Sequence, residues 1–115
     1  MTPEKLQKEV CKRFGSPFVE ALDSEKLGVA IATLGRVPIH GLRQNAENGT
    51  CGWYVWAGED LSDHPEFFQP LHVSHLETRC PEILPYLGLA PGWRFLIAPD
   101  HEDVWYDPTL LEPPA

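Results

Sequence analysis

The residues with the clearest chemical potential are two histidines and a cysteine in the middle of the chain. His72 and His75 stand three positions apart, and Cys80 follows five positions later. If residues 70–79 form a helix, both imidazole rings could face one point and bind a metal ion. No second ligand cluster accompanies them, and Pro81 disturbs the backbone beside Cys80. We therefore favour two structural histidines and no metal site, with a small metal-binding domain or enzyme as the alternative.

Other forms of catalysis have little support in the sequence. A reactive thiolate needs an electropositive setting, whereas Cys51 lies in an aromatic segment close to acidic residues, which raises a thiol pKa. The chain has no Gly-x-Ser-x-Gly motif and no phosphate-binding glycine loop. The acidic clusters at 59–63 and 100–103 have polar neighbours and lack the spacing of a calcium-binding loop. We predict no catalytic residue and no cofactor.

Length and composition exclude further classes of protein. The chain has 115 residues, 43% of them hydrophobic, which suits a single domain over 1–115. No apolar run reaches the roughly 18 residues of a membrane span, and the N-terminus shows no signal peptide. The three cysteines include no CxxC pair, so we expect reduced thiols and a cytoplasmic protein.

The net charge of −8 is concentrated in one part of the chain. Residues 44–115 contain twelve acidic residues and only two arginines. Such a surface repels the phosphates of nucleic acids and favours a basic protein as partner. Four of the acids fall within eight positions: Glu59, Asp60, Asp63 and Glu66.

The elements that position these residues predict an α+β fold: a small, mainly antiparallel sheet with helices packed on one face. Residues 3–14 read as an amphipathic helix, within an N-terminal helical segment 1–22 that includes a short helical turn at 18–22. The expected strands are 26–34 (a short apolar run that could also start a helix), 37–43, 51–57, 93–98 and 104–106. The remaining expected helices are 70–79 and 81–87.

Tryptophan is abundant, and its four copies divide between core and surface. We expect most of them in the core because each buries a large area, with structural roles for Trp53, Trp93 and Trp105. Arg43 is expected to act as a structural clamp that pairs with an acid or stacks on a tryptophan. Aromatic residues beside an acidic segment also suit a protein interface.

Several segments resemble a bacterial family, immunity protein family thirty-three, over roughly residues 24–110. The resemblance is carried by Gly41-Leu42-Arg43, by Gly52-Trp53 and Gly58-Glu59 within 47–59, and by five further segments: 67–73, Cys80-Pro81-Glu82, Tyr86-Leu87-Gly88-Leu89, Pro91-Gly92-Trp93-Arg94-Phe95 and 102–107. The resemblance implies a non-enzymatic inhibitor that binds a cognate toxin of a polymorphic toxin system.

On this interpretation the chain binds its toxin, or another basic protein, through two groups of residues. The four clustered acids Glu59, Asp60, Asp63 and Glu66 would steer the partner. The anchors would be Trp56, Phe67 and Phe68. An interaction domain without any toxin remains a further alternative.

Overall fold

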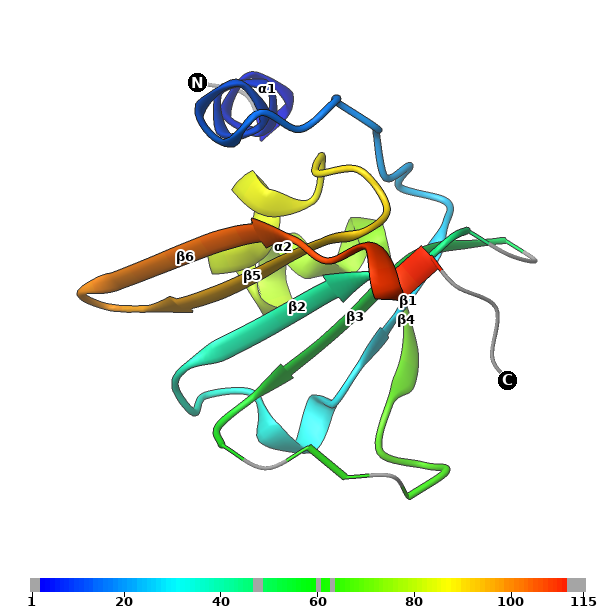
Figure 1. Ribbon diagram of the computed structural model, residues 1–115. Helices are drawn as coiled ribbons and strands as arrows, with labels where there is room; N and C mark the ends of the chain where they lie inside the picture. The colour runs from blue at the N-terminus through cyan, green and yellow to red at the C-terminus, as the bar shows by residue number, and fades with distance from the viewer. Residues whose placement is uncertain (1–2, 47–48, 60, 63, 112–115) are drawn as a thin grey trace.

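The computed structural model describes residues 3–46, 49–59, 61–62 and 64–111 and contains one six-stranded sheet (Figure 1). The strands in chain order are β1 (Lys26–Val29), β2 (Ile39–Arg43), β3 (Thr50–Ala57), β4 (Gln69–His72), β5 (Trp93–Ala98) and β6 (His101–Tyr106). Across the sheet they follow the order β4-β1-β3-β2-β5-β6. Every neighbouring pair is antiparallel except β1 and β3, which are parallel. The predicted α+β fold is confirmed, with 51–57, 93–98 and 104–106 in one sheet.

The helical elements are short apart from the first. Helix α1 spans Pro3–Phe14, as predicted, and ends where Gly15 adopts a positive φ of 85°. The others are α2 (Leu76–Arg79) and the 3-10 turns η1 (Ile31–Thr33), η2 (Val73–His75), η3 (Pro81–Tyr86) and η4 (Pro108–Leu111). Within the described residues, no helix has the length and apolar character needed to cross a membrane.

The prediction of a helix over 70–79 is wrong at its start. Gln69–His72 instead forms β4, an edge strand paired with β1, and helical structure begins only at Val73. Pro70 has no amide hydrogen to donate, and an edge strand is the position in a sheet that tolerates this loss. The predicted helix over 81–87 is a 3-10 helix, because Pro85 inside it cannot continue an α-helical hydrogen-bond ladder.

Two N-terminal expectations also change. Residues 18–22 are not helical: Phe18 forms an isolated bridge with Leu89, and the Val19 amide donates to Gly88 O. The strand expected over 26–34 stops at Val29, and η1 follows. The Thr33 hydroxyl donates to Ala30 O and accepts the Ala57 amide, so it fixes this turn against the end of β3.

The core lies on one face of the sheet. Its largest fully buried side chains include Trp53 and Val55 of β3, Phe95 of β5 and Leu27 of β1. Helix α1, α2 and η3 cover this face, and they lie behind and above the sheet in Figure 1. Gly41 makes room for the Phe95 ring, since a Cβ there would lie 2.1 Å from Phe95 Cε2.

Arg43 lies at the centre of this covered face and is only 2% exposed. Its Nε donates to Cys51 O at 2.9 Å. Its Nη1 lies 2.7 Å from Val19 O, 2.7 Å from Leu89 O and 3.2 Å from Leu87 O. The guanidinium also lies 5.7 Å from the centroid of the Trp53 ring. The partners of this arginine are therefore backbone carbonyls and a tryptophan face, and they join three other segments of the chain to β2.

Candidate protein-binding surface

The second face of the sheet, called here the open face, has no helix over it in the described part of the chain except the single turn η4 near one end (Figure 1). Side chains alternate between faces along a strand. The register therefore places His40, Trp56 and Leu96 side by side on the open face. The same register places a second row of side chains on the open face, in the order Tyr54, Leu42, Arg94 and Trp105.

An aromatic cluster occupies the β1–β3 end of the open face. Trp56 stacks on His40 with ring centroids 4.8 Å apart and planes 9° apart. Phe68 contacts Trp56 and Tyr54 edge-on, and Phe67 contacts Phe68. As a result Trp56 is only 4% exposed. The expectation that Trp56 is itself an anchor is corrected: it lies beneath Phe68 and His40 and supports the half-buried rings of Phe67 and Phe68.

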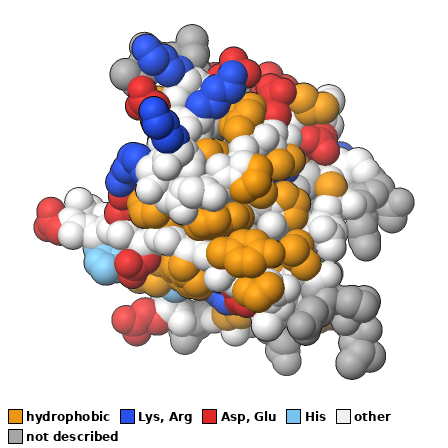
Figure 2. All heavy atoms as spheres, turned by 45° about the horizontal axis from the view of Figure 1, so that its top comes forward, with side chains coloured by type: hydrophobic (Ala, Val, Ile, Leu, Met, Phe, Trp, Pro, Cys, Tyr) orange, Lys and Arg blue, Asp and Glu red, His pale blue; other side chains and the backbone are white. Residues whose placement is uncertain are grey.

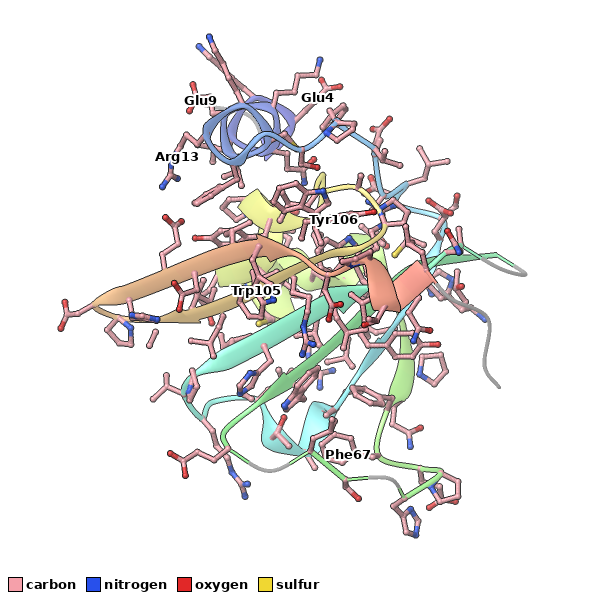
Figure 3. All side chains as sticks on the ribbon, in the orientation of Figure 1. Glu4, Glu9, Arg13, Phe67, Trp105 and Tyr106 are labelled. Atoms are coloured by element: carbon pink, nitrogen blue, oxygen red, sulfur yellow. The ribbon has the colours of Figure 1, made fainter. Side chains whose placement is uncertain are left out.

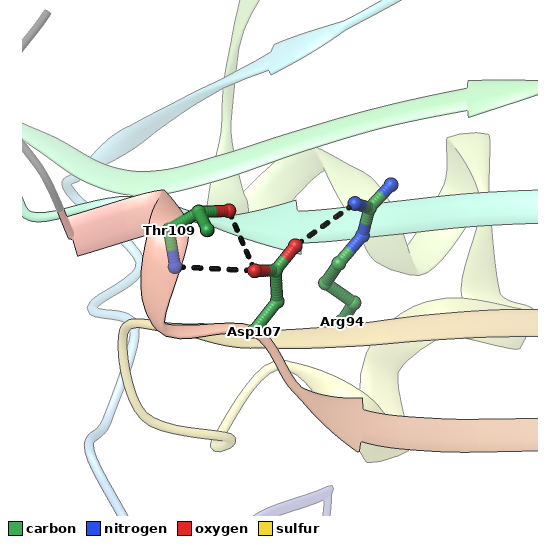
Figure 4. Close-up of polar contacts among 3 residues, drawn as sticks. All are labelled: Arg94, Asp107 and Thr109. Carbon is green, nitrogen blue, oxygen red and sulfur yellow. Dashed lines mark hydrogen bonds and ion pairs between the residues drawn. The ribbon is translucent and has the colours of Figure 1, made fainter.

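A second polar and aromatic group lies on β5 and β6 at the other side of the open face. Arg94 Nη1 forms an ion pair with Asp107 Oδ2 at 3.2 Å, and Asp107 Oδ1 accepts hydrogen bonds from the amide and hydroxyl of Thr109 (Figure 4). The hydrogen bonds from Thr109, followed by that from Arg94, lower the pKa of the Asp107 carboxyl. Asp107 therefore remains ionised and fixes one side of the Arg94 guanidinium.

Trp105 lies beside this ion pair and is 39% exposed, with the Arg94 guanidinium 5.5 Å from its ring centroid. Figure 3 shows Trp105 in front of β6 and Phe67 below the lower end of the sheet. Trp105, for which a structural role is expected, is thus a tryptophan of the surface rather than of the core. Because β6 is an edge strand, only one neighbouring strand is present to cover its side chains.

Tyr106, which follows Trp105, points to the opposite face of the sheet and is 49% exposed. Its ring lies over Gly92, where a Cβ would approach Tyr106 Cε1 to 2.5 Å, and beside the half-buried Trp93. Figure 2 shows apolar side chains gathered in the middle of the molecule, below the lysine and arginine side chains of α1. Strand β6 thus carries a large exposed aromatic ring on each of its two faces.

The acidic cluster predicted to steer a partner lies in the segment between β3 and β4. Glu59 and Glu66 are exposed, while Asp60 and Asp63 lie outside the described residues. The Glu66 carbonyl accepts a hydrogen bond from the Gln69 side chain, and its amide donates to His64 Nδ1. These bonds hold the backbone of Glu66 beside Phe67 and Phe68, so an acidic and an aromatic group adjoin at this edge of the open face.

The two histidines and Cys80 do not form a common site. The rings of His72 and His75 are exposed and 5.7 Å apart, whereas Cys80 is buried and its thiol points to Glu82. Burial, together with the Glu82 charge, raises the pKa of Cys80 to about 11. Across the described residues, no group of three histidine, cysteine, aspartate or glutamate side chains is arranged to bind a metal.

The other two cysteines are equally unsuited to nucleophilic attack. Cys11 and Cys51 are buried free thiols, and desolvation raises the pKa of each. The cause differs in part from the one expected for Cys51, because loss of water around the thiol, rather than nearby acids, is the main effect. All three cysteines are therefore buried thiols with raised pKa values, which is the opposite of an activated nucleophile.

The model of the Imm33-like domain matches residues 6–107 of the chain. The chain belongs to the Imm33-like family. No curated protein and no solved structure matches it significantly. The match begins inside α1, so the Imm33-like region extends further toward the N-terminus than the resemblance over 24–110 suggested. In this Imm33-like chain α1 is thus part of the family domain, where it covers the core.

Sequence reasoning did not find the surface at β6 of this Imm33-like protein. Arg94 and Tyr106 were given no site role, and Trp105 was expected in the core. The available signal was that β6 is the last expected strand, paired through a hairpin, and therefore a candidate for the sheet edge. What the sequence could not supply is the order of the strands, which leaves β6 with β5 as its one neighbour among the described strands.

Proposed function

We propose that this Imm33-like protein is an immunity protein, which binds a cognate bacterial toxin in the cytoplasm and blocks it without catalysing a reaction. The observation that carries the proposal is the family match over 6–107, nine-tenths of the chain. The described residues support it further, since they present recognition surfaces and no arrangement typical of metal or thiol chemistry.

The open face is the part of the molecule that best suits this binding. Aromatic side chains with exposed faces are over-represented among residues that dominate binding energy, and Phe67, Phe68 and Trp105 supply them at two ends of this face. Between them, Trp56 and His40 form a packed floor. A rigid floor lowers the entropic cost of binding because few side chains must be ordered.

The charge of the protein indicates the character of the toxin surface. A net charge of −8 at 115 residues accelerates encounters with basic surfaces and opposes encounters with acidic ones. The cluster of Glu59, Asp60, Asp63 and Glu66 beside Phe67 would orient the approaching toxin. A toxin with a basic active-site cleft, such as one that acts on nucleic acid, is the partner that this charge favours.

The direct test searches the genes that flank the gene of this chain for a toxin domain and uses that domain as the candidate partner. Expressed alone in bacteria that domain should arrest growth, and co-expression of the Imm33-like protein should restore it. Calorimetry with the two purified proteins should give a 1:1 complex, and Trp105→Ala should weaken it at least tenfold. Leu22→Ala is the matched control, because Leu22 is 50% exposed in the segment between α1 and β1. No complex and no rescue would overturn the proposal.

A further inference from the structure

Strand β6 is a free edge of the sheet. Among the described residues it pairs only with β5, and five of its six residues are exposed. In Figure 1 it forms the outer margin of the sheet, with no strand beyond it. A free edge presents unpaired backbone N–H and C=O groups, which can accept another strand.

The register defines which backbone groups are available. The Asp107 amide donates to Gly92 O across the β5–β6 pair, and hydrogen-bonding direction alternates along an antiparallel strand. The amides of Trp105, Asp103 and His101 therefore face β5. Those of Glu102, Val104 and Tyr106 point away from the sheet, and they form one continuous row of donors and acceptors.

The opposite edge of the sheet is protected, which makes β6 the preferred site. Strand β4 has only four residues, and Pro70 within it lacks an amide hydrogen. Proline and short length are two devices by which edge strands avoid pairing. Strand β6 has six residues and no proline, and its exposed aromatic side chains, Trp105 and Tyr106, could clamp an added strand from both faces.

The charge of this hairpin selects among possible occupants. Residues 99–107 contain four acids and no lysine or arginine. A second copy of the chain, paired antiparallel through β6, would place its Asp103 near the Asp103 of the first copy, and each copy carries a net charge of −8. A strand that carries lysine or arginine avoids both the repulsion between two Asp103 side chains and the repulsion between two net negative charges. Asp107 and Glu102 already pair with Arg94 and Arg13, so the basic strand would meet the exposed Asp100 and Asp103 of this hairpin. Arg94 already shows how a guanidinium lies against the Trp105 ring.

We propose that β6 is an edge-pairing site at which an extended, basic segment of the partner toxin adds a strand to the sheet. Main-chain hydrogen bonds to Glu102, Val104 and Tyr106 would supply the pairing, and Trp105 and Tyr106 would contact alternate side chains of the added strand. The inference rests on the proposed function and extends it from an open face to a defined edge.

Hydrogen–deuterium exchange, resolved to single amides by NMR, tests the proposal with the candidate toxin domain. In the free protein the amides of Asp103, Trp105 and Asp107 should exchange slowly, and those of Val104 and Tyr106 quickly. In the complex the Val104 and Tyr106 amides should slow at least tenfold. A complex that leaves both amides fast would overturn edge pairing but keep the proposed function, whereas the absence of any complex would overturn both.

A backbone variant provides an independent readout. Val104→Pro removes the central outward amide and leaves every amide that faces β5, so the hairpin should still form. Its matched control is Val104→Ala, which removes the same side-chain packing but keeps the amide. We expect the alanine variant to bind within about threefold of the wild type and the proline variant at least tenfold more weakly. Equal affinities would contradict the proposal, and if the proline variant does not fold, the exchange experiment decides.

Discussion

Arg43 carries a permanent charge in the covered half of the protein, and its contacts explain how that charge is tolerated. Burial lowers the pKa of its guanidinium, yet an arginine pKa is so high that the group stays protonated. Carbonyl oxygens of four residues, Val19, Cys51, Leu87 and Leu89, surround it. These carbonyl oxygens compensate the buried charge. The same hydrogen bonds hold four chain segments together, counting β2 itself.

Removing this side chain should be costly. Arg43→Ala leaves several buried carbonyls without a donor, each of which costs about 1–3 kcal/mol, so we expect the free energy of unfolding to fall by at least about 3 kcal/mol. Arg43→Lys should give an intermediate loss, because one ammonium group cannot reproduce the planar array of donors. Urea unfolding measures both, with Arg79→Ala, an exposed arginine of α2, as control. A loss below 1 kcal/mol for Arg43→Ala would remove the clamp role.

The three buried thiols predict low chemical reactivity. Burial raises the pKa of Cys11, Cys51 and Cys80, so each thiol remains protonated at pH 8 and is shielded from reagents. Iodoacetamide should label none of them in the native protein within the time that labels all three in urea, as counted by intact mass. Rapid native labelling of one cysteine would show that its segment opens or that its thiolate is stabilised.

At the scale of elements, the carboxylate of Glu102 connects strand β6 with helix α1 and the 3-10 helix η3. Glu102 of β6 accepts hydrogen bonds from Arg13 at the end of α1 and from Tyr86 at the end of η3. The bond from Arg13, followed by that from Tyr86, lowers the pKa of Glu102. Burial is the main cause that raises the pKa of Tyr86, and its bond to Glu102 adds to it. The hairpin β5–β6 is thus fixed to the layer that covers the core.

The lowered pKa of Glu102 predicts how stability depends on pH. A carboxyl whose pKa is lower in the folded than in the unfolded protein contributes stability above its ordinary pKa and loses it as the pH falls through the folded value. Glu102→Gln should therefore lower the free energy of unfolding by roughly 1 kcal/mol or less at pH 7, since the ion pair is partly solvated. The difference from wild type should shrink in thermal unfolding scans as the pH falls below the ordinary pKa of a glutamate, about 4.3. A constant difference from pH 7 to 3 would contradict this origin.

The elements also show where sequence reasoning succeeds and where it fails. Helix α1 and strands β3 and β5 have strong patterns and were predicted within a residue or two. Strand β4 was missed because its pairing with β1 comes from a distant part of the chain, which no local pattern reveals. The different exposure of Trp56 and Trp105 has the same origin. Phe68 contacts Trp56, whereas Trp105 lies on an edge strand and stays 39% exposed, and both facts depend on strand order and on the path of a loop.

At the scale of the whole molecule, the uneven charge predicts the kinetics of association. Neutralising Glu59, Asp60, Asp63 and Glu66 with glutamine and asparagine should slow association with the toxin domain at low salt, and the loss should shrink as salt screens charges over a Debye length of ~8–10 Å. It should also raise thermal stability slightly at low salt, because repulsion within the cluster is relieved.

The control for this experiment changes the same net charge elsewhere. Replacing Glu4, Glu9, Glu20 and Glu77, exposed acids on or near α1 and α2, with glutamine removes four charges away from the open face. Stopped-flow association should be slowed less by this control than by the cluster variant. Equal slowing by both would mean that the total charge matters and the position of the cluster does not.

The arrangement around Arg43 has a consequence for the order of events during synthesis. Two of the carbonyls that satisfy its charge belong to Leu87 and Leu89, and β6 follows still later in the chain. A chain that grows from its N-terminus therefore keeps the Arg43 guanidinium hydrated, and this part of the core open, until residues 87–89 have been made. Its free edge appears after that. Closure of the core and formation of the free edge therefore both wait for the segment from residue 87 onward.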